Sequence, residues 1–231
     1  MERVCEPELM EGVLQARAYA DADFAASDQA LVERIGALFG ADLGPRIADL
    51  GCGPGNITFS LAARYPGAAV LGIDGAAAML AIAEERRRAR AAAAEGAPGS
   101  PPLPGFRLAR LPDAALEEEL AGRCSALVSN SLLHHLHEPQ VLWRTLRRLA
   151  APGAAVLVKD LRRPHDEDEL RALVERHMVG APAVLRHDFF ASLQAAFTPA
   201  EVEAQLRRAG MAQLQVQALA DRYLEIQGRL P

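Results

Sequence analysis

The sequence contains few cysteines and few aromatic residues. Of its 231 residues, three are cysteines (positions 5, 52 and 124), and aromatic residues make up 5%. An odd number of widely spaced cysteines is not the pattern of a disulfide framework, so we expect a reducing, cytoplasmic environment. The N-terminal segment MERVCEPELMEG also lacks the apolar run of a signal peptide.

The chain also lacks a long apolar run and an excess of positive charge. No stretch reaches the roughly 18 apolar residues that a membrane helix needs, which predicts no membrane partner. The formal net charge of -5 argues against a general nucleic-acid-binding protein. Half of the residues are hydrophobic, which is enough for one sizeable core.

Strands and helices are predicted to alternate between residues 45 and 160. The apolar runs RIADL, AAVLGID, FRLA, CSALVSN and AAVLVKD predict five buried strands with helices between them. Near the C-terminus, AQLQVQAL and RYLEIQGR are separated by only two residues, which favours an antiparallel hairpin. The pattern therefore predicts an α/β fold with a mostly parallel sheet and a C-terminal antiparallel hairpin.

Helices are predicted on both sides of this alternating region. At the N-terminus, one helix is expected to carry Leu9, Met10, Val13 and Leu14 on a single face, and a second is expected to run from an N-cap at Ser27 to Gly40. Later segments are predicted to be helical at 166–178 and 187–197, and the Pro- and Gly-rich stretch 96–105 is predicted to be a surface loop.

A glycine-rich turn follows the first predicted strand. Gly51, Gly53 and Gly55 remove side chains where a strand meets a helix, so backbone amides can approach a ligand there. The spacing is G-x-G-x-G rather than the G-x-G-x-x-G of dinucleotide binders, which favours a smaller ligand portion such as an amino-acid tail. Asp74 ends the second strand, where a carboxylate can accept both ribose hydroxyls or cap the next helix.

The six histidines all lie between residues 134 and 187. His134 and His135 follow the fourth predicted strand, and either could act as a general base, although a turn in which one packs and the other is solvated is equally open. Asp160 ends the fifth strand and is expected to point toward the pocket. The His-His-x-His spacing lacks an i, i+4 pair and paired cysteines are absent, so no metal site is predicted.

Four segments together resemble one protein family. ADLGCGPGN, VLGIDGAAAML, CSALVSNSLLHHLHEP and LRRLAAPGAAVLVKD occur in the order typical of class I S-adenosylmethionine-dependent methyltransferases, and are most similar to the small-molecule group often called type 11. The resemblance implies a Rossmann-like, doubly wound, mostly parallel seven-stranded sheet. It also implies S-adenosyl-L-methionine as cofactor and in-line methyl transfer to a small-molecule acceptor.

The same resemblance implies domain limits and site residues. Residues 1–44 would form an N-terminal helical cap and residues 45–231 the S-adenosylmethionine-binding methyltransferase domain, with a helical lid at 161–197. From their positions after the fourth and fifth strands, the catalytic candidates are His134, His135 and Asp160. The residues expected to bind the cofactor are Tyr19, Asp49, Gly51, Gly53, Asp74, Gly75, Met79, Leu111, Pro112, Asn130 and Ser131. Relatives often carry an acidic residue just after the third strand, where this chain has Ala109-Arg110.

Several alternatives remain open at this point. The acceptor could be a peptide or protein side chain, or the chain could be a non-catalytic methyltransferase-like partner subunit. A dehydrogenase is disfavoured by the reversed hairpin and by the glycine spacing. A homodimer is compatible with the sequence.

Overall fold

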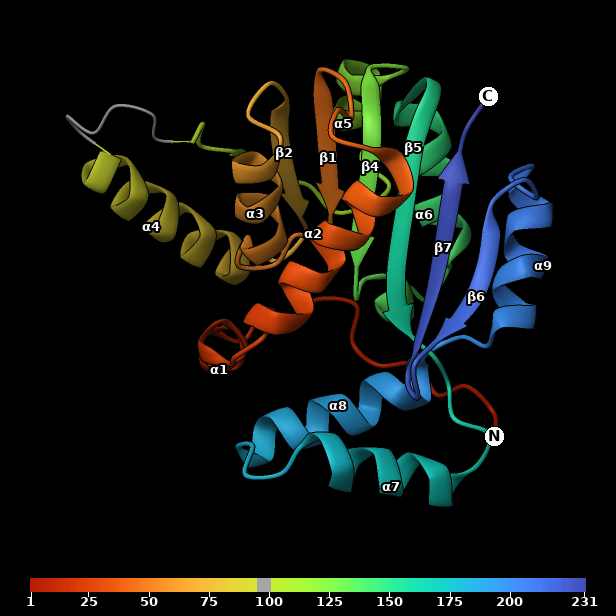
Figure 1. Cartoon of the computed structure of the whole chain (residues 1–231). Coiled ribbons are helices and arrows are strands. Elements are labelled where there is room, and N and C mark those ends of the chain that lie inside the picture. The colour runs from red at the N-terminus through yellow and green to blue at the C-terminus, as the bar shows by residue number, and fades with distance from the viewer. Residues whose placement is uncertain (95–100) are drawn as a thin grey trace.

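The protein is built around one seven-stranded sheet (Figure 1). The computed structural model describes residues 1–94 and 101–231. The strands, in chain order, are β1 (Arg46–Leu50), β2 (Ala69–Asp74), β3 (Gly105–Leu108), β4 (Cys124–Asn130), β5 (Ala150–Leu161), β6 (Gln215–Leu219) and β7 (Tyr223–Arg229).

The strand order confirms the predicted fold class. The order across the sheet is β3-β2-β1-β4-β5-β7-β6. β1 to β5 are parallel to one another, whereas β7 runs antiparallel to both β5 and β6. The order in which the strands are connected changes direction between β1 and β4, and this leaves a crevice at their carboxyl ends. Ligands bind at such a crevice in open α/β sheets.

Helices cover both faces of the sheet, as a doubly wound fold requires (Figure 1). Apolar residues of α5, α6 and α9 form one core with the sheet, and those of α2 and α3 form another on the opposite face. The helical elements are α1 (Val13–Asp21), α2 (Ala25–Phe39), α3 (Asn56–Arg64), α4 (Ala77–Ala94), α5 (Ala114–Leu120), the 3-10 turn η1 (Leu133–His135), α6 (Gln140–Leu149), α7 (Glu167–His177), α8 (Ala183–Ala195) and α9 (Pro199–Ala209).

The capping residues explain several of these boundaries. At α9, Thr198 and Glu201 form the reciprocal capping box that the sequence predicts, and Gly210 ends the helix with a φ of 67°. The helix α5 is absent from the sequence prediction, although Asp113 caps it by accepting a hydrogen bond from the Leu116 amide. We find the predicted N-cap at Ser27 to be wrong, because α2 begins at Ala25 without a side-chain cap.

The predicted start of the first helix is also wrong. Residues 1–12 contain no helix and α1 begins at Val13. Leu14, predicted to face the core, is 88% exposed. We call residues 1–12 the N-terminal strap. In Figure 1 the strap runs along the carboxyl ends of the parallel strands, between the sheet and the α7–α8 pair.

The two helices α7 and α8 form a small layer with its own core. Leu170 and Leu173 of α7 pack with Leu193 of α8 and with Leu161 at the end of β5. The first helix of this layer matches its prediction, whereas α8 begins four residues before the predicted position 187. The layer covers the edge of the sheet at which β5 ends.

Two further predictions relate to the described residues. Half of the predicted surface loop at 96–105, namely positions 96–100, lies outside the described residues, and positions 101–104 belong to no helix or strand. Within residues 1–94 and 101–231, no helix combines the length and apolarity needed to cross a membrane.

Candidate functional site

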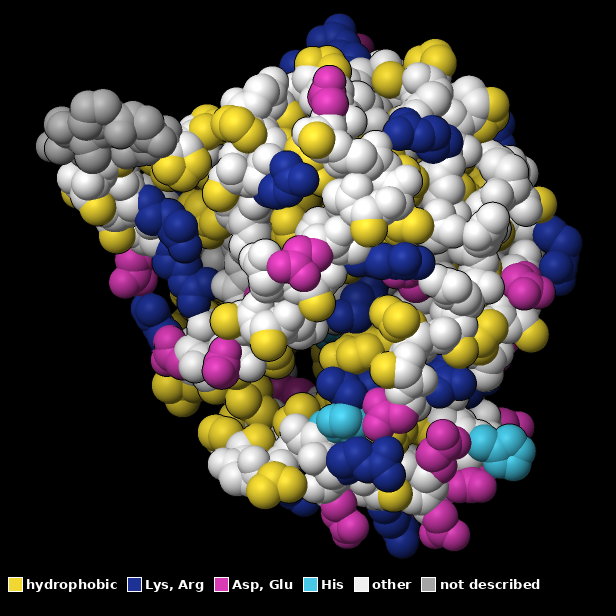
Figure 2. Space-filling model, viewed as in Figure 1, with side chains coloured by type: hydrophobic (Ala, Val, Ile, Leu, Met, Phe, Trp, Pro, Cys, Tyr) yellow, Lys and Arg dark blue, Asp and Glu magenta, His cyan; other side chains and the backbone are white. Residues whose placement is uncertain are grey.

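A cavity of about 790 Å³ lies at the carboxyl ends of the parallel strands. It lies within the range of about 300–1,000 Å³ typical of small-molecule sites. Figure 2 shows it as a hollow above the α7–α8 pair. Of the residues predicted for the site, those that line the cavity are Tyr19, Asp49, Gly51, Gly53, Asp74, Gly75, Met79, Leu111, Asn130, Ser131, His134 and His135.

The backbone of the glycine loop borders the cavity directly, because Gly51 and Gly53 have no side chains. Gly51 and Gly53 have φ angles of 71° and 53°, which side-chain-bearing residues rarely adopt. A Cβ atom on Gly51 would lie 2.8 Å from the Cβ atom of Leu132, so the next loop packs directly on this backbone. A Cβ on Gly53 would meet nothing within 4 Å. The Gly53 backbone therefore faces open space along the cavity wall.

Asp74 holds the glycine loop and the following helix at once. One carboxylate oxygen accepts a hydrogen bond from the Gly53 amide, and the other accepts one from the Ala76 amide, each at 2.8 Å. Burial raises the pKa of Asp74, and the backbone hydrogen bonds oppose that rise. Each oxygen keeps a lone pair for a ligand hydroxyl. The two roles that the sequence left open for Asp74, helix capping and ligand binding, are therefore compatible.

Asp49 is a second carboxylate, set deeper in the cavity wall. It is 1% exposed and accepts a hydrogen bond of 2.6 Å from the Thr58 hydroxyl. Burial raises its pKa to about 7. A nearby positive charge would favour its ionised form. The cluster of carboxylates near the glycine loop suits a cationic ligand portion.

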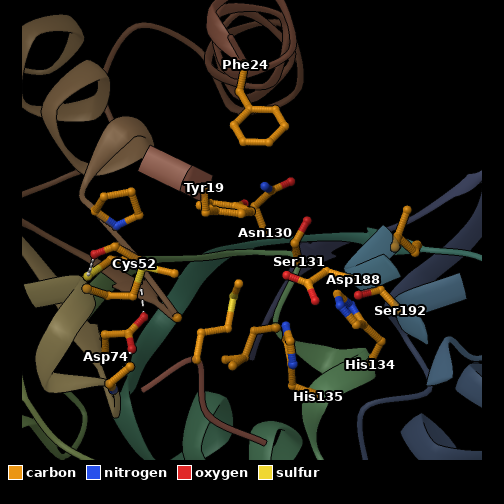
Figure 3. Close-up of a pocket in the computed structure, with 18 of the residues that line it drawn as sticks. Tyr19, Phe24, Cys52, Asp74, Asn130, Ser131, His134, His135, Asp188 and Ser192 are labelled. Carbon is orange, nitrogen blue, oxygen red and sulfur yellow. Dashed lines mark hydrogen bonds between the residues drawn. The ribbon is translucent and has the colours of Figure 1, made fainter. Parts of the chain in front are cut away.

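The segment 131–137, which we call the histidine turn, forms the opposite wall (Figure 3). Ser131 begins it with a φ of 58°, a strained conformation for a residue with a side chain, and its amide donates to the Lys159 carbonyl. Asn130 and Ser131 thus lie between the glycine loop and the histidines. Tyr19 and Phe24, whose ring centroids are 4.9 Å apart, face them from α1 and the turn after it.

Asp160 does not face the cavity, so that part of its prediction is wrong. It is 1% exposed and accepts hydrogen bonds from the Leu133 amide, the Leu161 amide and Nδ1 of His134. The contact with His134 measures 2.5 Å. We therefore assign Asp160 as a residue that positions His134. Pro112, another predicted site residue, is not among those that line the cavity.

Among the histidines that line the cavity, the two catalytic candidates, His134 and His135, have pKa values shifted in opposite directions. Burial disfavours a charged His134, but Asp160 and Glu6 outweigh burial and raise its pKa. Burial and the neighbouring His134 lower the pKa of His135 to about 3. A general base works best with a pKa near the operating pH. The very low basicity of His135 fits that role poorly, and the carboxylates of Asp160 and Glu6 favour the protonated form of His134.

The strap and α8 supply site residues that the sequence analysis missed. Glu6 reaches His134 and His135 from the strap, and its Oε2 accepts a hydrogen bond from Ser192 of α8 at 3.2 Å. Glu8 pairs with Arg110 at 2.6 Å, so the strap brings a carboxylate to the place where the chain lacks the expected acid. No local motif marks these residues, because the strap meets the site only in the folded protein.

Comparisons with known proteins agree with this architecture. The plantazolicin methyltransferase BamL superposes with a TM-score of 0.66 at 13% identity, covering 93% of this chain and 90% of that one. A SAM-dependent methyltransferase from Aquifex aeolicus gives a TM-score of 0.61 at 15% identity, covering 94% and 98%. At these identities the likeness concerns the fold, which is that of a Rossmann-like α/β protein with a reversed C-terminal hairpin.

Sequence comparisons match a known domain to part of the chain. A family model described as "Methyltransferase domain" matches residues 48–156, from β1 to β5. Residues 48–156 therefore match a methyltransferase domain, and they do so within a fold shared with S-adenosylmethionine-dependent methyltransferases.

Two curated relatives illustrate the extent of the sequence match. A trans-aconitate 2-methyltransferase from Methylobacterium nodulans is 36% identical over 137 residues, which is 59% of this chain and 45% of that protein. One from Streptomyces coelicolor is 32% identical over 173 residues, which is 72% and 50%. The chain spans about half the length of the curated relatives it matches.

Proposed function

We propose that the protein transfers a methyl group from S-adenosyl-L-methionine to a small-molecule acceptor. The observation that carries the proposal is one cavity bounded by the Gly53 backbone, Asp74 and Ser131. When bound, the cofactor supplies a methyl group activated on a sulfonium, and the protein aligns the acceptor for in-line displacement and excludes water.

The residues present fit this cofactor. Asp74 retains lone pairs for the ribose hydroxyls, and the bare Gly53 backbone leaves room for the methionine portion. Asp49 lies where it would meet the cationic amino group of that portion. Tyr19 and Met79 line the same cavity. The carboxylates thus match the positive charge of the ligand.

For the acceptor, we propose a small carboxylic acid. The curated relatives carry the name trans-aconitate 2-methyltransferase. A carboxyl group has a pKa near 4 and is an anion at pH 7, so it needs no general base. That agrees with a site in which His134 favours the protonated form and His135 is a very weak base.

Calorimetric titration with S-adenosylmethionine and S-adenosylhomocysteine tests the cofactor site. We expect Asp74→Ala to weaken binding at least tenfold, about 1.4 kcal/mol. Asp113→Asn is the matched control, because Asp113 caps α5 outside the cavity and asparagine caps equally well. Failure of the intact chain to bind either compound would contradict the proposal.

Acceptors are then screened by mass spectrometry, with trans-aconitate and related small acids beside peptides. Methylation of a small acid supports the proposal. Methylation of peptides alone would favour a protein-directed enzyme, and cofactor binding without transfer to any acceptor would favour a non-catalytic partner subunit.

We also propose a domain organisation, a location and an oligomeric state for the protein. Residues 1–44 act as a cap on the methyltransferase domain at 45–231, with the lid at 161–197. A cytoplasmic location is supported by the absence of disulfides at Cys5, Cys52 and Cys124. A net charge of -5 supports the lack of a nucleic-acid partner. We further propose that the protein forms a homodimer, which a molar mass from light scattering tests.

A further inference from the structure

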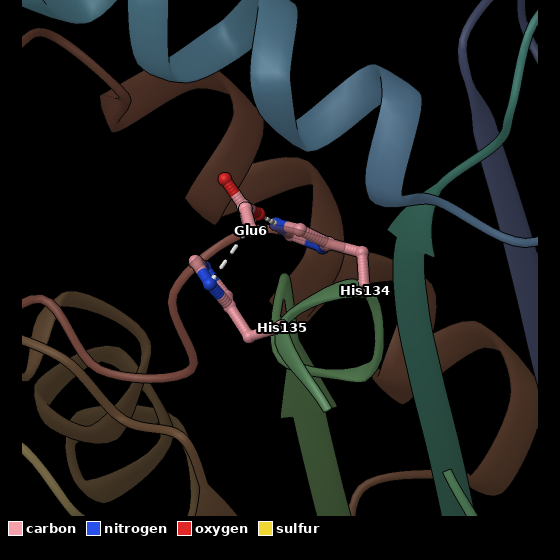
Figure 4. A group of neighbouring side chains, drawn as sticks. All are labelled: Glu6, His134 and His135. Atoms are coloured by element: carbon pink, nitrogen blue, oxygen red, sulfur yellow. Dashed lines mark ion pairs between the residues drawn. The ribbon is translucent and has the colours of Figure 1, made fainter. Parts of the chain in front are cut away.

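One acidic side chain from the strap, Glu6, is buried between His134 and His135 (Figure 4). Oε1 of Glu6 lies 3.3 Å from Nε2 of His134 and 3.4 Å from Nδ1 of His135. The Glu6 side chain is 9% exposed. Within the described part of the chain, its Oε1 is buried and has no hydrogen-bond partner. The three side chains thus aim three potential ligand atoms at one point.

We propose that Glu6, His134 and His135 bind a divalent transition-metal cation such as Zn²⁺, contrary to the expectation from the histidine spacing alone. The three ligand atoms all lie within 4.8 Å of one another. Tetrahedral zinc holds nitrogen and oxygen ligands at about 2.0–2.1 Å, which places such ligands about 3.3–3.4 Å apart. The two distances from Glu6 match this separation.

The surroundings of His134 are those of a metal-bound histidine. Its Nδ1 faces Asp160 at 2.5 Å, so a neutral ring carries its proton on that nitrogen and leaves a lone pair on Nε2. A carboxylate behind a metal-binding histidine fixes the tautomer and the orientation of the ring. Asp160 is itself held by two backbone amides, so this support is rigid.

Charge balance favours a divalent cation over a proton. With both histidines neutral, Glu6 and Asp160 bring two negative charges into a buried cluster. A proton on His134 balances one of these charges, whereas a divalent cation balances both, and an uncompensated buried charge is costly. The Pro7 carbonyl oxygen accepts a hydrogen bond of 3.3 Å from Nδ1 of His135 when that nitrogen carries the proton, so a cation bound at Nδ1 would replace this contact.

The cluster also has the open position of a reactive or ligand-binding metal site. All three ligand residues line the cavity. Three protein ligands leave a fourth tetrahedral position free for water or for an anionic oxygen. The cation would therefore bind an anionic group of a molecule in the cavity. This inference rests on the geometry of the cluster alone, not on the proposed methyl transfer.

Titration of the chelator-treated full chain with Co²⁺, without cofactor, tests the proposal. We expect one equivalent to bind and to give the visible absorption bands of a four-coordinate cobalt site, which Zn²⁺ then abolishes by displacement. Glu6→Gln and His135→Gln should each remove the bands. Circular dichroism confirms that the variants fold, and two independent positions keep the test valid if one does not.

Two control variants test whether side chains outside the cluster bind the cation. His165→Gln removes an imidazole that is 91% exposed and remote from the cavity, and Cys5→Ser removes the thiol next to Glu6 in the sequence. Both should keep the bands unchanged. Absence of binding by the intact chain, bands that persist in Glu6→Gln, or loss of the bands in Cys5→Ser would each overturn the proposal. None of these readouts depends on whether the protein transfers a methyl group.

Discussion

The two halves of the cavity are assembled in different ways. The cofactor half consists of the glycine loop and Asp74, which come from two adjacent strands and the turns that follow them. The acceptor half consists of the histidine turn, the strap and α8, segments that lie far apart in the sequence. The cofactor half is therefore local and can be recognised from its motif, whereas the acceptor half depends on long-range contacts. Substitutions in each half should separate cofactor binding from acceptor recognition.

The largest effect is expected in the cofactor half, at Gly51. Gly51→Val places a side chain at a φ of 71° and against Leu132, where even a Cβ atom would lie at 2.8 Å. Backbone strain and overpacking together should destabilise the fold by roughly 2–5 kcal/mol and abolish cofactor binding. Denaturant unfolding and calorimetry measure the two effects.

Gly122→Val is the matched control for this substitution. Gly122 has a φ of 65° and nothing within 4 Å of a Cβ position, so the variant carries the backbone strain without the clash. It should lose about 1–3 kcal/mol of stability and bind the cofactor as the intact chain does. Normal cofactor affinity in Gly51→Val would show that close packing of this loop is not required.

The next effect is expected in the acceptor half, at Arg3. Its guanidinium donates hydrogen bonds to the carbonyl oxygens of His134, Leu136 and Ala195, so one side chain ties the strap to both the histidine turn and α8. A hydrogen bond from a charged group contributes about 1.5–3 kcal/mol to stability. Arg3→Ala should therefore free the strap, raise the acceptor KM about tenfold or more and leave cofactor affinity nearly unchanged.

Steady-state kinetics and cofactor titration together measure this separation. Arg17→Ala is the control, because Arg17 forms only an exposed pair with Glu85, and such pairs contribute little. If Arg3→Ala weakened cofactor and acceptor binding equally, the division into two halves would be incorrect.

The difference between the halves also explains how much the sequence could predict. The sheet and the glycine loop follow from apolar runs and turn residues that lie next to one another in the chain, and the observed strand order confirms them. The part played by Glu6 depends on where the strap lies, and no local pattern marks it. Asp160 has the predicted position at the end of β5, but its orientation is set by His134 and two amides.

A pH dependence of cofactor binding is expected from the cofactor half. The pKa of Asp49 is raised to about 7 from its ordinary value of 3.8, mainly by burial. Between these values the folded protein binds more protons than the unfolded chain, so this group lowers stability as pH rises toward 7. A cationic cofactor favours ionised Asp49. Cofactor affinity should therefore increase with pH, by up to about tenfold per unit below pH 7.

Calorimetry between about pH 5.5 and 7 measures this slope, in a range where the α-amino group of the ligand stays charged. Asp49→Asn should flatten the profile, since the variant has no proton to lose at this position. A slope that persists in Asp49→Asn would assign the titration to another group.

The smallest effect is expected at Leu14, where the sequence pattern and the structure disagree. An apolar residue four positions after Met10 favours a buried helical face, but the strap ends before α1 and leaves Leu14 88% exposed. Leu14→Ser should change the free energy of unfolding by less than about 0.5 kcal/mol. Ile35→Ala in α2, where the side chain is 1% exposed, should cost about 2–5 kcal/mol in the same experiment. A loss of more than about 1 kcal/mol in Leu14→Ser would mean that the helix continues toward Pro7 and buries this face. The strap would then not reach the histidine turn, and the contacts that distinguish the acceptor half from the cofactor half would be absent.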